Sequence, residues 1–276
     1  MGNNSNGIEI EHNSKNEKLL MTYLFCLLFL LTGFIANAQY SDNALYLNYL
    51  TQDMSLWGKY LETTDFNKLS NKERQRYLNY EYGYIAFISV EKSSKVQTLI
   101  KQFNSQLEQM SGKMPESTRL TYLSAAAAYA ITQNKLSMLS NGAKTLMLSK
   151  QAIENDPNDP IALTMRGSLF FYCPKTFGGD KQQALNYLIK AEKIFRERAD
   201  TINNWNYRSA QMIIAQCYEK TDRKEQAIVC CKKILHQEPN FSYIRDFYLP
   251  ELQGKRTKKG TDPQAIGSSF VKTFGE

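Results

Sequence analysis

The chain has 276 residues and a formal net charge of +7, from 34 lysines and arginines against 27 aspartates and glutamates. This length is sufficient for one extended repeat protein or for a single domain with a sizeable core. The positive charge is dispersed, with an excess near the C-terminus, which is more typical of a solvated surface than of a nucleic-acid site. We therefore expect no nucleic-acid partner.

The first 38 residues have the pattern of a secretory signal peptide. Lys15 and Lys18 precede an apolar run at 19–35, and small residues follow in an Ala-Asn-Ala sequence that ends at Ala38. The alternative is an uncleaved membrane anchor, but the run is shorter than the roughly 20 apolar residues that a spanning helix needs. We therefore predict that residues 1–38 are removed on export, and that the mature protein resides in a bacterial periplasm.

The next segment, residues 39–252, is predicted to be an all-α domain because its apolar residues follow helical spacing and no strand-like alternation appears. Asp159 followed by Pro160 predicts the cap and first residue of a helix. Asp180 and Asp222 each precede a glutamine or glutamate by three residues, the spacing of a capping box. Each is therefore predicted to begin another helix.

Two flanking helices are predicted to cover the ends of this domain. Residues 42–61 place leucines and Trp57 largely on one side, and residues 242–252 could cover the other end. Residues 253–276 are rich in lysine, threonine, glycine and serine, and we expect little order there. This basic tail permits peripheral contact with a membrane.

Small residues recur at fixed helix positions through the domain and let neighbouring helices approach closely. In the best-matched units, Gly167 and Ala184 stand at such positions, as do Ala215 and Ala227. The pattern resembles the tetratricopeptide repeat (TPR) family, whose unit is a pair of antiparallel helices. The resemblance implies a right-handed solenoid of about four units with flanking capping helices. The small residues that anchor the four units are Gly83, Ala126, Gly167 and Ala215.

The segment from Pro174 to Asp180 reads PKTFGGD and is the most distinctive local motif. Paired glycines permit backbone conformations that other residues avoid. One interpretation is an elongated turn between two helices, in which Asp180 caps the second helix. The other is a ligand-binding loop. A similar glycine-glycine-aspartate turn occurs in TPR-like periplasmic proteins associated with TRAP-type transporters and in Sel1-like repeats.

The TPR resemblance also implies a concave groove lined by fixed positions on the first helix of each unit. In the Gly83 unit these positions carry aromatic residues, which are frequent binding hot spots when they are exposed. The alternative is that they are core residues that pack on the helix predicted at 42–61. We expect Tyr80 and Tyr84 to be exposed. The predicted ligand-binding residues are Tyr77, Tyr80, Tyr84, Phe87, Phe171 and Tyr172.

No catalytic or metal-binding constellation is recognisable in the sequence. His236 is the single histidine after the predicted cleavage site, no histidine or cysteine spacing suits a metal, and the common catalytic fingerprints are absent. Cys217, Cys230 and Cys231 are predicted to be buried thiols, with a bridge between Cys217 and Cys230 as the alternative. We therefore expect no enzymatic activity, no cofactor and no metal.

The sequence thus favours an exported TPR-like scaffold that binds a protein or peptide partner in a concave groove. The alternative is a periplasmic small-molecule-binding accessory protein of a transport system, suggested by the glycine-glycine-aspartate turn. The two functions predict different structures. A scaffold requires an open groove, whereas a solute-binding protein requires an enclosed pocket of roughly 300–1,000 Å³ lined with aromatic residues.

Overall fold

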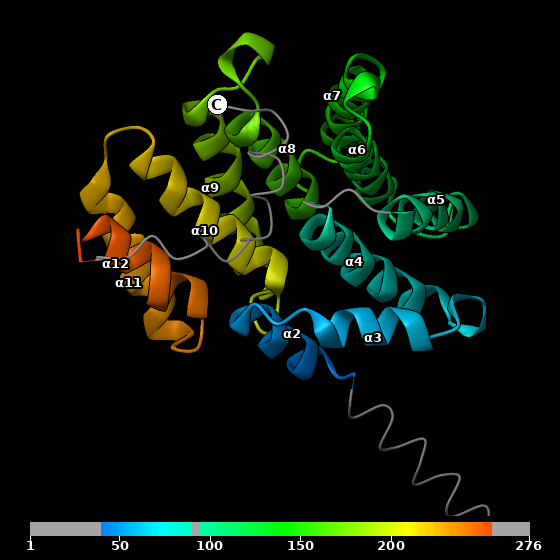
Figure 1. Cartoon of the computed structure of the whole chain (residues 1–276), viewed down its shortest axis with the longest axis horizontal. Helices are drawn as coiled ribbons and strands as arrows, with labels where there is room; N and C mark the ends of the chain where they lie inside the picture. Colours follow the sequence, from blue (N-terminus) through cyan, green and yellow to red (C-terminus); the bar gives the residue numbers. More distant parts are fainter. Residues whose placement is uncertain (1–39, 90–93, 256–276) are drawn as a thin grey trace, which may run out of the picture. The chain divides into compact units, whose positions relative to one another are not determined.

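The computed structural model of the protein describes residues 40–89 and 94–255 (Figure 1). These residues form helices and contain no β-strand, which confirms the all-α class. Tertiary contacts separate the chain after Ala44, and the unit that begins at Leu45 contains the helical core. Within the described ranges no helix is long and apolar enough to cross a membrane. The predicted signal peptide and almost all of the predicted tail lie outside the described residues.

The N-terminal flanking region consists of two helices, α2 (Asp42–Thr51) and α3 (Ser55–Thr63), so the prediction of one helix over 42–61 is wrong. The break falls at Gln52, whose φ of 61° is incompatible with a right-handed helix. The side chain of Asp53 then accepts a hydrogen bond from the Ser55 amide at 3.0 Å and helps to start α3.

The next elements carry conventional helix starts. The short 3₁₀ helix η1 (Phe66–Lys68) is capped by Asp65, whose side chain accepts a hydrogen bond from the backbone. Helix α4 (Asn71–Ile88) begins with a complete capping box at Ser70. Helix α5 (Ser94–Gln109) packs against both α4 and the following helix.

The rest of the chain is built from helices that pack on their sequence neighbours (Figure 1). Short 3₁₀ helices interrupt two of the connections, and a π-helix stands near the end of the described residues. The elements are α6 (Glu116–Gln133), η2 (Lys135–Ser137), α7 (Met138–Asn155), α8 (Pro160–Tyr172), η3 (Lys175–Phe177), α9 (Lys181–Glu197), α10 (Trp205–Glu219), α11 (Lys224–Gln237), the π-helix η4 (Tyr243–Tyr248) and α12 (Leu249–Leu252).

Small residues allow the close approach of paired helices, as the sequence predicts. A Cβ atom added to Gly167 on α8 would lie 2.6 Å from Cγ of Leu188 and 3.1 Å from the carbonyl oxygen of Ala184, both on α9. The small residues at corresponding points of the last pair, Ala215 and Ala227, are fully buried. A larger side chain at these positions would force the helices apart.

Two of the three predicted helix caps are confirmed. Asp159 accepts hydrogen bonds from two backbone amides at the start of α8, and Asp180 does the same at the start of α9. The prediction for Asp222 is wrong. That residue has a φ of 59°, and α11 begins after Arg223 without a side-chain cap. Asp222 therefore completes the turn instead of capping the helix.

An aromatic cluster joins the first helices to α10, far along the chain. It comprises Tyr49, Trp57, Tyr80, Tyr82 and Trp205, and we call it the aromatic junction. The rings of Trp57 and Trp205 lie 5.5 Å apart, and those of Trp57 and Tyr80 lie 4.9 Å apart in edge-to-face contact. A Cβ atom at Gly83 would lie 2.6 Å from one indole and 2.9 Å from the other, so only glycine fits between them.

A buried charge network reinforces this connection. The Arg208 guanidinium on α10 forms an ion pair with Glu238 at 2.8 Å and donates to the Tyr46 hydroxyl of α2 at 2.9 Å. Tyr46 in turn donates to the Glu238 carboxylate at 2.7 Å. Removing one member would leave a buried charge without its partner, which is strongly destabilising. Helices α2 and α10 and the end of α11 are thus held together.

Candidate functional site

The expected exposure of Tyr80 is wrong, and Tyr84 is half-buried. Tyr80 is 3% exposed because it packs edge-on against Trp57 and Tyr60 in the aromatic junction. Tyr77 is also buried, and its hydroxyl donates to the Leu61 carbonyl at 3.1 Å. Tyr77 and Tyr80 therefore pack on the preceding helices, as the alternative interpretation of the sequence predicts.

The six predicted ligand-binding residues do not share one surface. Phe171 and Tyr172 are buried and lie in edge-to-face contact at 4.9 Å, while Tyr84 and Phe87 are half-buried. Three of the six residues line one or the other of two distinct pockets. Tyr77 and Tyr84 line the first and Tyr172 lines the second, whereas Tyr80, Phe87 and Phe171 line neither.

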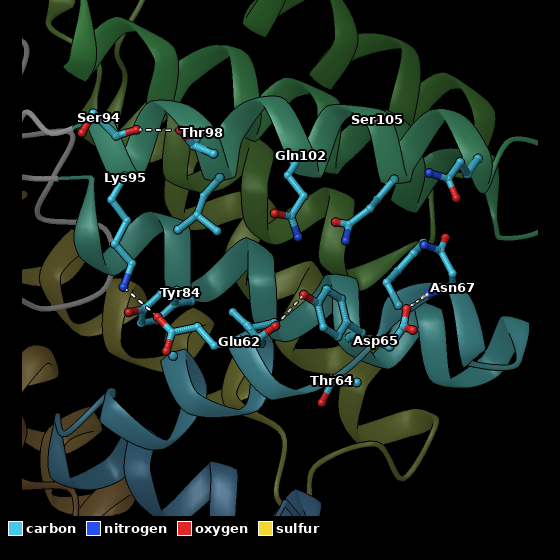
Figure 2. Close-up of a pocket in the computed structure, with 17 residues that line it drawn as sticks. Glu62, Thr64, Asp65, Asn67, Tyr84, Ser94, Lys95, Thr98, Gln102 and Ser105 are labelled. Carbon is cyan, nitrogen blue, oxygen red and sulfur yellow. Dashed lines mark hydrogen bonds and ion pairs between the residues drawn. The ribbon is translucent and has the colours of Figure 1, made fainter.

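The first pocket lies between α3, η1, α4 and α5 and has a volume of about 710 Å³ (Figure 2). We call it the α3–α5 pocket. Its aromatic wall consists of Phe66, Tyr77 and Tyr84. Opposite this wall, α5 presents a stripe of hydroxyl and amide side chains to the pocket. The apolar residues of α5 are buried on another face of the helix. The residues of this stripe are Thr98, Gln102, Ser105, Gln106 and Gln109.

Charged groups stand at the edge of the α3–α5 pocket. The Lys95 ammonium on α5 reaches across to the Glu62 carboxylate of α3 at 2.8 Å, as Figure 2 shows. The hydrogen bond to Glu62 raises the pKa of Lys95. Asp65 also lines the pocket and caps η1. The ion pair is exposed and contributes little to stability, but it places opposite charges at the entrance.

Deeper in this region, two buried side chains carry oxygen atoms that have no hydrogen-bond partner within residues 40–89 and 94–255. Gln106, which lines the pocket, is 5% exposed, and its Oε1 accepts no hydrogen bond. Glu81 is 0% exposed, and neither carboxylate oxygen is paired. Burial raises the pKa of Glu81 to about 8. It lies on α4 between Tyr77 and Tyr84, which both line the pocket. Unpaired buried polar groups are costly and call for a physical explanation.

The second pocket lies between α6, α7, α8 and η3 and has a volume of about 270 Å³. We call it the α6–α8 pocket. Its surface is almost entirely hydrocarbon, and its rim carries large apolar side chains in contact with water. Leu139 is 85% exposed and Phe177 is 56% exposed, and Leu146 is exposed beside them. The lining residues include Ala128, Ile131, Met138, Gly142, Ala143, Leu169, Tyr172 and Cys173.

The glycine-glycine-aspartate turn contributes Phe177 to the lining of the α6–α8 pocket. Gly178 has a φ of 88°, and a Cβ atom on Gly179 would lie 1.7 Å from the Cys173 carbonyl oxygen, so both positions require glycine. The Cys173 thiol donates to the Phe177 carbonyl at 3.3 Å, and the Asp180 amide donates to the Phe170 carbonyl at 2.9 Å. The motif is therefore a turn between α8 and α9, and it also holds Phe177 at the pocket rim.

The sequence analysis missed the features that define both pockets. The stripe on α5 is visible as polar residues at helical spacing, from Thr98 through Gln102 to Gln109. For the second pocket the signal is a pair of leucines, Leu136 and Leu139, in a segment otherwise rich in polar residues. Neither pattern reveals a hollow by itself, because the hollow depends on how adjacent helices diverge.

Among the described residues no group of three or more histidine, cysteine, aspartate or glutamate side chains could hold a metal ion. Cys217 and Cys231 are buried as predicted, whereas Cys230 is half-buried. Burial raises the pKa values of Cys217 and Cys231 to about 12. These thiols therefore stay protonated at neutral pH and serve as small apolar side chains.

Comparison with known proteins identifies a similar fold. No protein-family model matches the chain, and no curated protein matches it. Among solved structures, the HusA haemophore from Porphyromonas gingivalis is similar, with a TM-score of 0.52 and 17% sequence identity. The match covers 66% of this chain and 95% of the haemophore chain. At this identity the likeness shows a shared helical fold.

Proposed function

We propose that this chain is an exported helical binding protein that holds a small, largely apolar ligand in the α6–α8 pocket. The observation that carries the proposal is a hydrocarbon-lined hollow whose rim exposes Leu139, Leu146 and Phe177. Contiguous exposed apolar side chains of this kind mark binding sites in proteins. A dry apolar cavity of about 150 Å³ already binds benzene, so a hollow of 270 Å³ has room for a larger apolar group.

A peptide-binding scaffold is less well supported. The small residues at Gly167, Ala184 and Ala215 are consistent with a TPR-like solenoid, which we retain as part of the proposal. In that architecture the groove would lie along the first helix of each unit. The side chains implied for it, such as Tyr77 and Tyr80, are buried instead. A solute-binding role therefore agrees better with the structure than a groove for a partner chain.

The chemistry of the pocket favours a flat apolar ligand with acidic groups at its edge. The hydrocarbon lining suits the body of such a molecule, and η2 and η3 carry the exposed cations Lys135 and Lys175. A porphyrin has this character, and the similar fold is that of a haemophore. A porphyrin is larger than the hollow of about 270 Å³, so part of it would rest on the exposed rim formed by Leu139 and Phe177. We propose a porphyrin as the first ligand to test.

Iron coordination is not expected to dominate binding. Met138, Tyr172 and Cys173 line the pocket and belong to residue types that ligate haem iron. Burial raises the pKa values of Tyr172 and Cys173, which disfavours the anionic forms that would bind ferric iron. His236 is not among the lining residues. The apolar walls would therefore supply most of the binding free energy.

Export is the second part of the proposal. It is supported by the pattern at 1–38 and by the fold shared with a haemophore. Intact-mass analysis of protein recovered from cell envelopes should find a chain that begins at Gln39. Retention of residues 19–35 would instead indicate an anchor. A binding role in this compartment requires no catalytic group, and we propose none.

The ligand proposal can be tested by titrating the purified protein with haem and with metal-free protoporphyrin, followed by absorbance and tryptophan fluorescence. We expect both to bind with one site, and their affinities to agree within about threefold, or about 0.7 kcal/mol. Strong preference for haem would show that iron coordination carries the binding. Absence of binding by both would overturn the porphyrin class.

The location of the porphyrin site is tested with matched surface variants. Leu139→Asp and Phe177→Asp place a charge on the rim and should each weaken porphyrin binding at least about tenfold, or about 1.4 kcal/mol. Val229→Asp is the control, because Val229 is 64% exposed on α11 and lies outside the pocket. Equal binding by all three variants would place the ligand elsewhere.

A further inference from the structure

The α3–α5 pocket has an unmet requirement for hydrogen-bond donors. Several donors on its walls are already engaged. The Tyr77 hydroxyl donates to Leu61, the Thr98 hydroxyl to Ser94, and the Lys95 ammonium to Glu62. The buried lining atom that has no partner among the described residues is an acceptor, Oε1 of Gln106. A molecule that completes this site must therefore donate hydrogen bonds.

The charged residues of the pocket indicate which class of hydrogen-bond donor would bind there. Its lining includes two carboxylates, Glu62 and Asp65, and one ammonium group, that of Lys95. Acidic groups outnumber the cation, so the site favours a positively charged donor over a neutral or anionic one.

The remaining walls suit the same kind of molecule. Tyr77 and Tyr84 present aromatic rings to the pocket, and such rings attract cations over their faces and stack with apolar groups. The volume of about 710 Å³ lies in the range of small-molecule sites. The pocket therefore joins an aromatic surface, an unpaired buried acceptor and an acidic rim.

We infer that the α3–α5 pocket binds a small molecule with a primary ammonium group beside an apolar or aromatic body. The ammonium group donates to Oε1 of Gln106, and the body rests against Tyr77 and Tyr84. This site is separate from the proposed porphyrin site, since the two pockets share no lining residue. The failure of either proposal leaves the other standing.

The inference is tested with three probes of one shape, namely benzylammonium, benzyl alcohol and benzoate. Each is titrated into the purified full chain and followed by calorimetry and by ligand-observed NMR at neutral pH. We expect benzylammonium to bind at least about tenfold more tightly than benzyl alcohol, and benzoate to show no binding. Equal binding of ammonium and alcohol would overturn the cationic class. No binding of any probe would overturn the site.

Charge variants on the rim give opposite expectations and avoid the core. Glu62→Gln should weaken benzylammonium binding about threefold or more, because it removes an anion and leaves Lys95 unpaired. Lys95→Gln should strengthen binding by a similar factor, because it frees the Glu62 carboxylate. If the affinity for benzylammonium changed in the same direction in both variants, or changed in neither variant, the electrostatic argument would be contradicted.

The buried acceptor is tested with a pair of glutamines on the same helix. Gln106→Leu removes the unpaired oxygen at nearly constant size and should reduce benzylammonium affinity at least about tenfold. Gln97→Leu is the control, because Gln97 is exposed on α5 and does not line the pocket. Circular dichroism establishes that both variants fold. If Gln106→Leu does not fold, Gln106→Met takes its place, and unchanged affinity in the folded variant would refute the role of Gln106.

Discussion

The aromatic junction and the two pockets show how differently the same helical fold uses its aromatic and apolar residues. In the junction, Trp57, Tyr80 and Trp205 are packed against each other and against Gly83, with no room for a single added carbon. In the α6–α8 pocket, Leu139 and Phe177 are exposed around a hollow. Stability should therefore concentrate at the junction and binding at the pockets. Substitutions can separate the two roles.

The largest effect is expected for Tyr80→Ala in the junction. Emptying a buried aromatic site costs about 3–5 kcal/mol in the free energy of unfolding. Ligand binding by the fraction that remains folded should be unchanged, because Tyr80 lines neither pocket. Chemical denaturation of wild type and variant measures the difference. A nearly unchanged free energy of unfolding would mean that Tyr80 is exposed and that the groove predicted from the sequence exists.

A smaller effect is expected for Gly167→Leu at the contact between α8 and α9. The new side chain would meet Leu188 and the Ala184 carbonyl, and overpacking of this kind costs about 1–3 kcal/mol. Thermal denaturation should show a lower melting temperature. The matched control is Gly142→Leu, where an added Cβ atom meets nothing within 4 Å. Equal stability of Gly167→Leu and wild type would contradict the close helix contact.

Glu81 lies on α4 between Tyr80 and Tyr82 of the aromatic junction, and its contribution to the free energy of unfolding should depend on pH. Burial raises its folded-state pKa to about 8, from 4.5 when exposed. Between these values the folded protein retains a proton that the unfolded chain releases, so the free energy of unfolding falls as pH rises, by up to about 1.4 kcal/mol per pH unit. The stabilisation is fully present below about pH 4.5 and is lost as the pH rises through about 8.

This dependence is measured by urea denaturation at several pH values between about 5 and 8. Glu81→Gln should flatten the curve and make the variant more stable relative to wild type at the alkaline end. Glu154→Gln, at an exposed site on α7, serves as the control and should leave the slope unaltered. A wild-type slope that survives in Glu81→Gln would assign the titration to another group.

The smallest effect on stability is expected for Phe177→Ala. The side chain is more than half exposed, and surface substitutions of this kind change the free energy of unfolding by no more than about 0.5 kcal/mol. Porphyrin binding should nevertheless weaken measurably, because the aromatic rim is lost. The comparison between junction and pocket would fail if Phe177→Ala destabilised the protein as much as Tyr80→Ala.

Local sequence signals predicted the parts of this structure that depend on neighbouring residues. The helical class, the caps at Asp159 and Asp180, and the close packing at Gly167 all follow from short-range spacing. The same signals failed at Gln52 and Asp222, where the backbone takes positive φ values. Those conformations are set by the turn as a whole, and neither residue type demands them.

The site was less predictable because it depends on contacts between distant segments. Tyr77 and Tyr80 have the spacing of a groove and equally that of a core, and the ring of Tyr60, which contacts both of them, decides for burial. The unpaired Oε1 of Gln106 is likewise invisible in the sequence, since it depends on which side chains of other helices come within hydrogen-bond distance. A helical pattern identifies a face but not what covers it.

The connection between Tyr46 and Arg208 has a consequence for how the protein unfolds. These residues are 162 positions apart, and their hydrogen bond joins helices from opposite ends of the described chain. In an open array of helical repeats each unit contacts only its neighbours, so the ends can fray independently. Here α2 and α10 lose their contacts together. We therefore expect amide hydrogens of α2 and α10 to exchange through one shared opening event, with the cooperativity of a single folding unit.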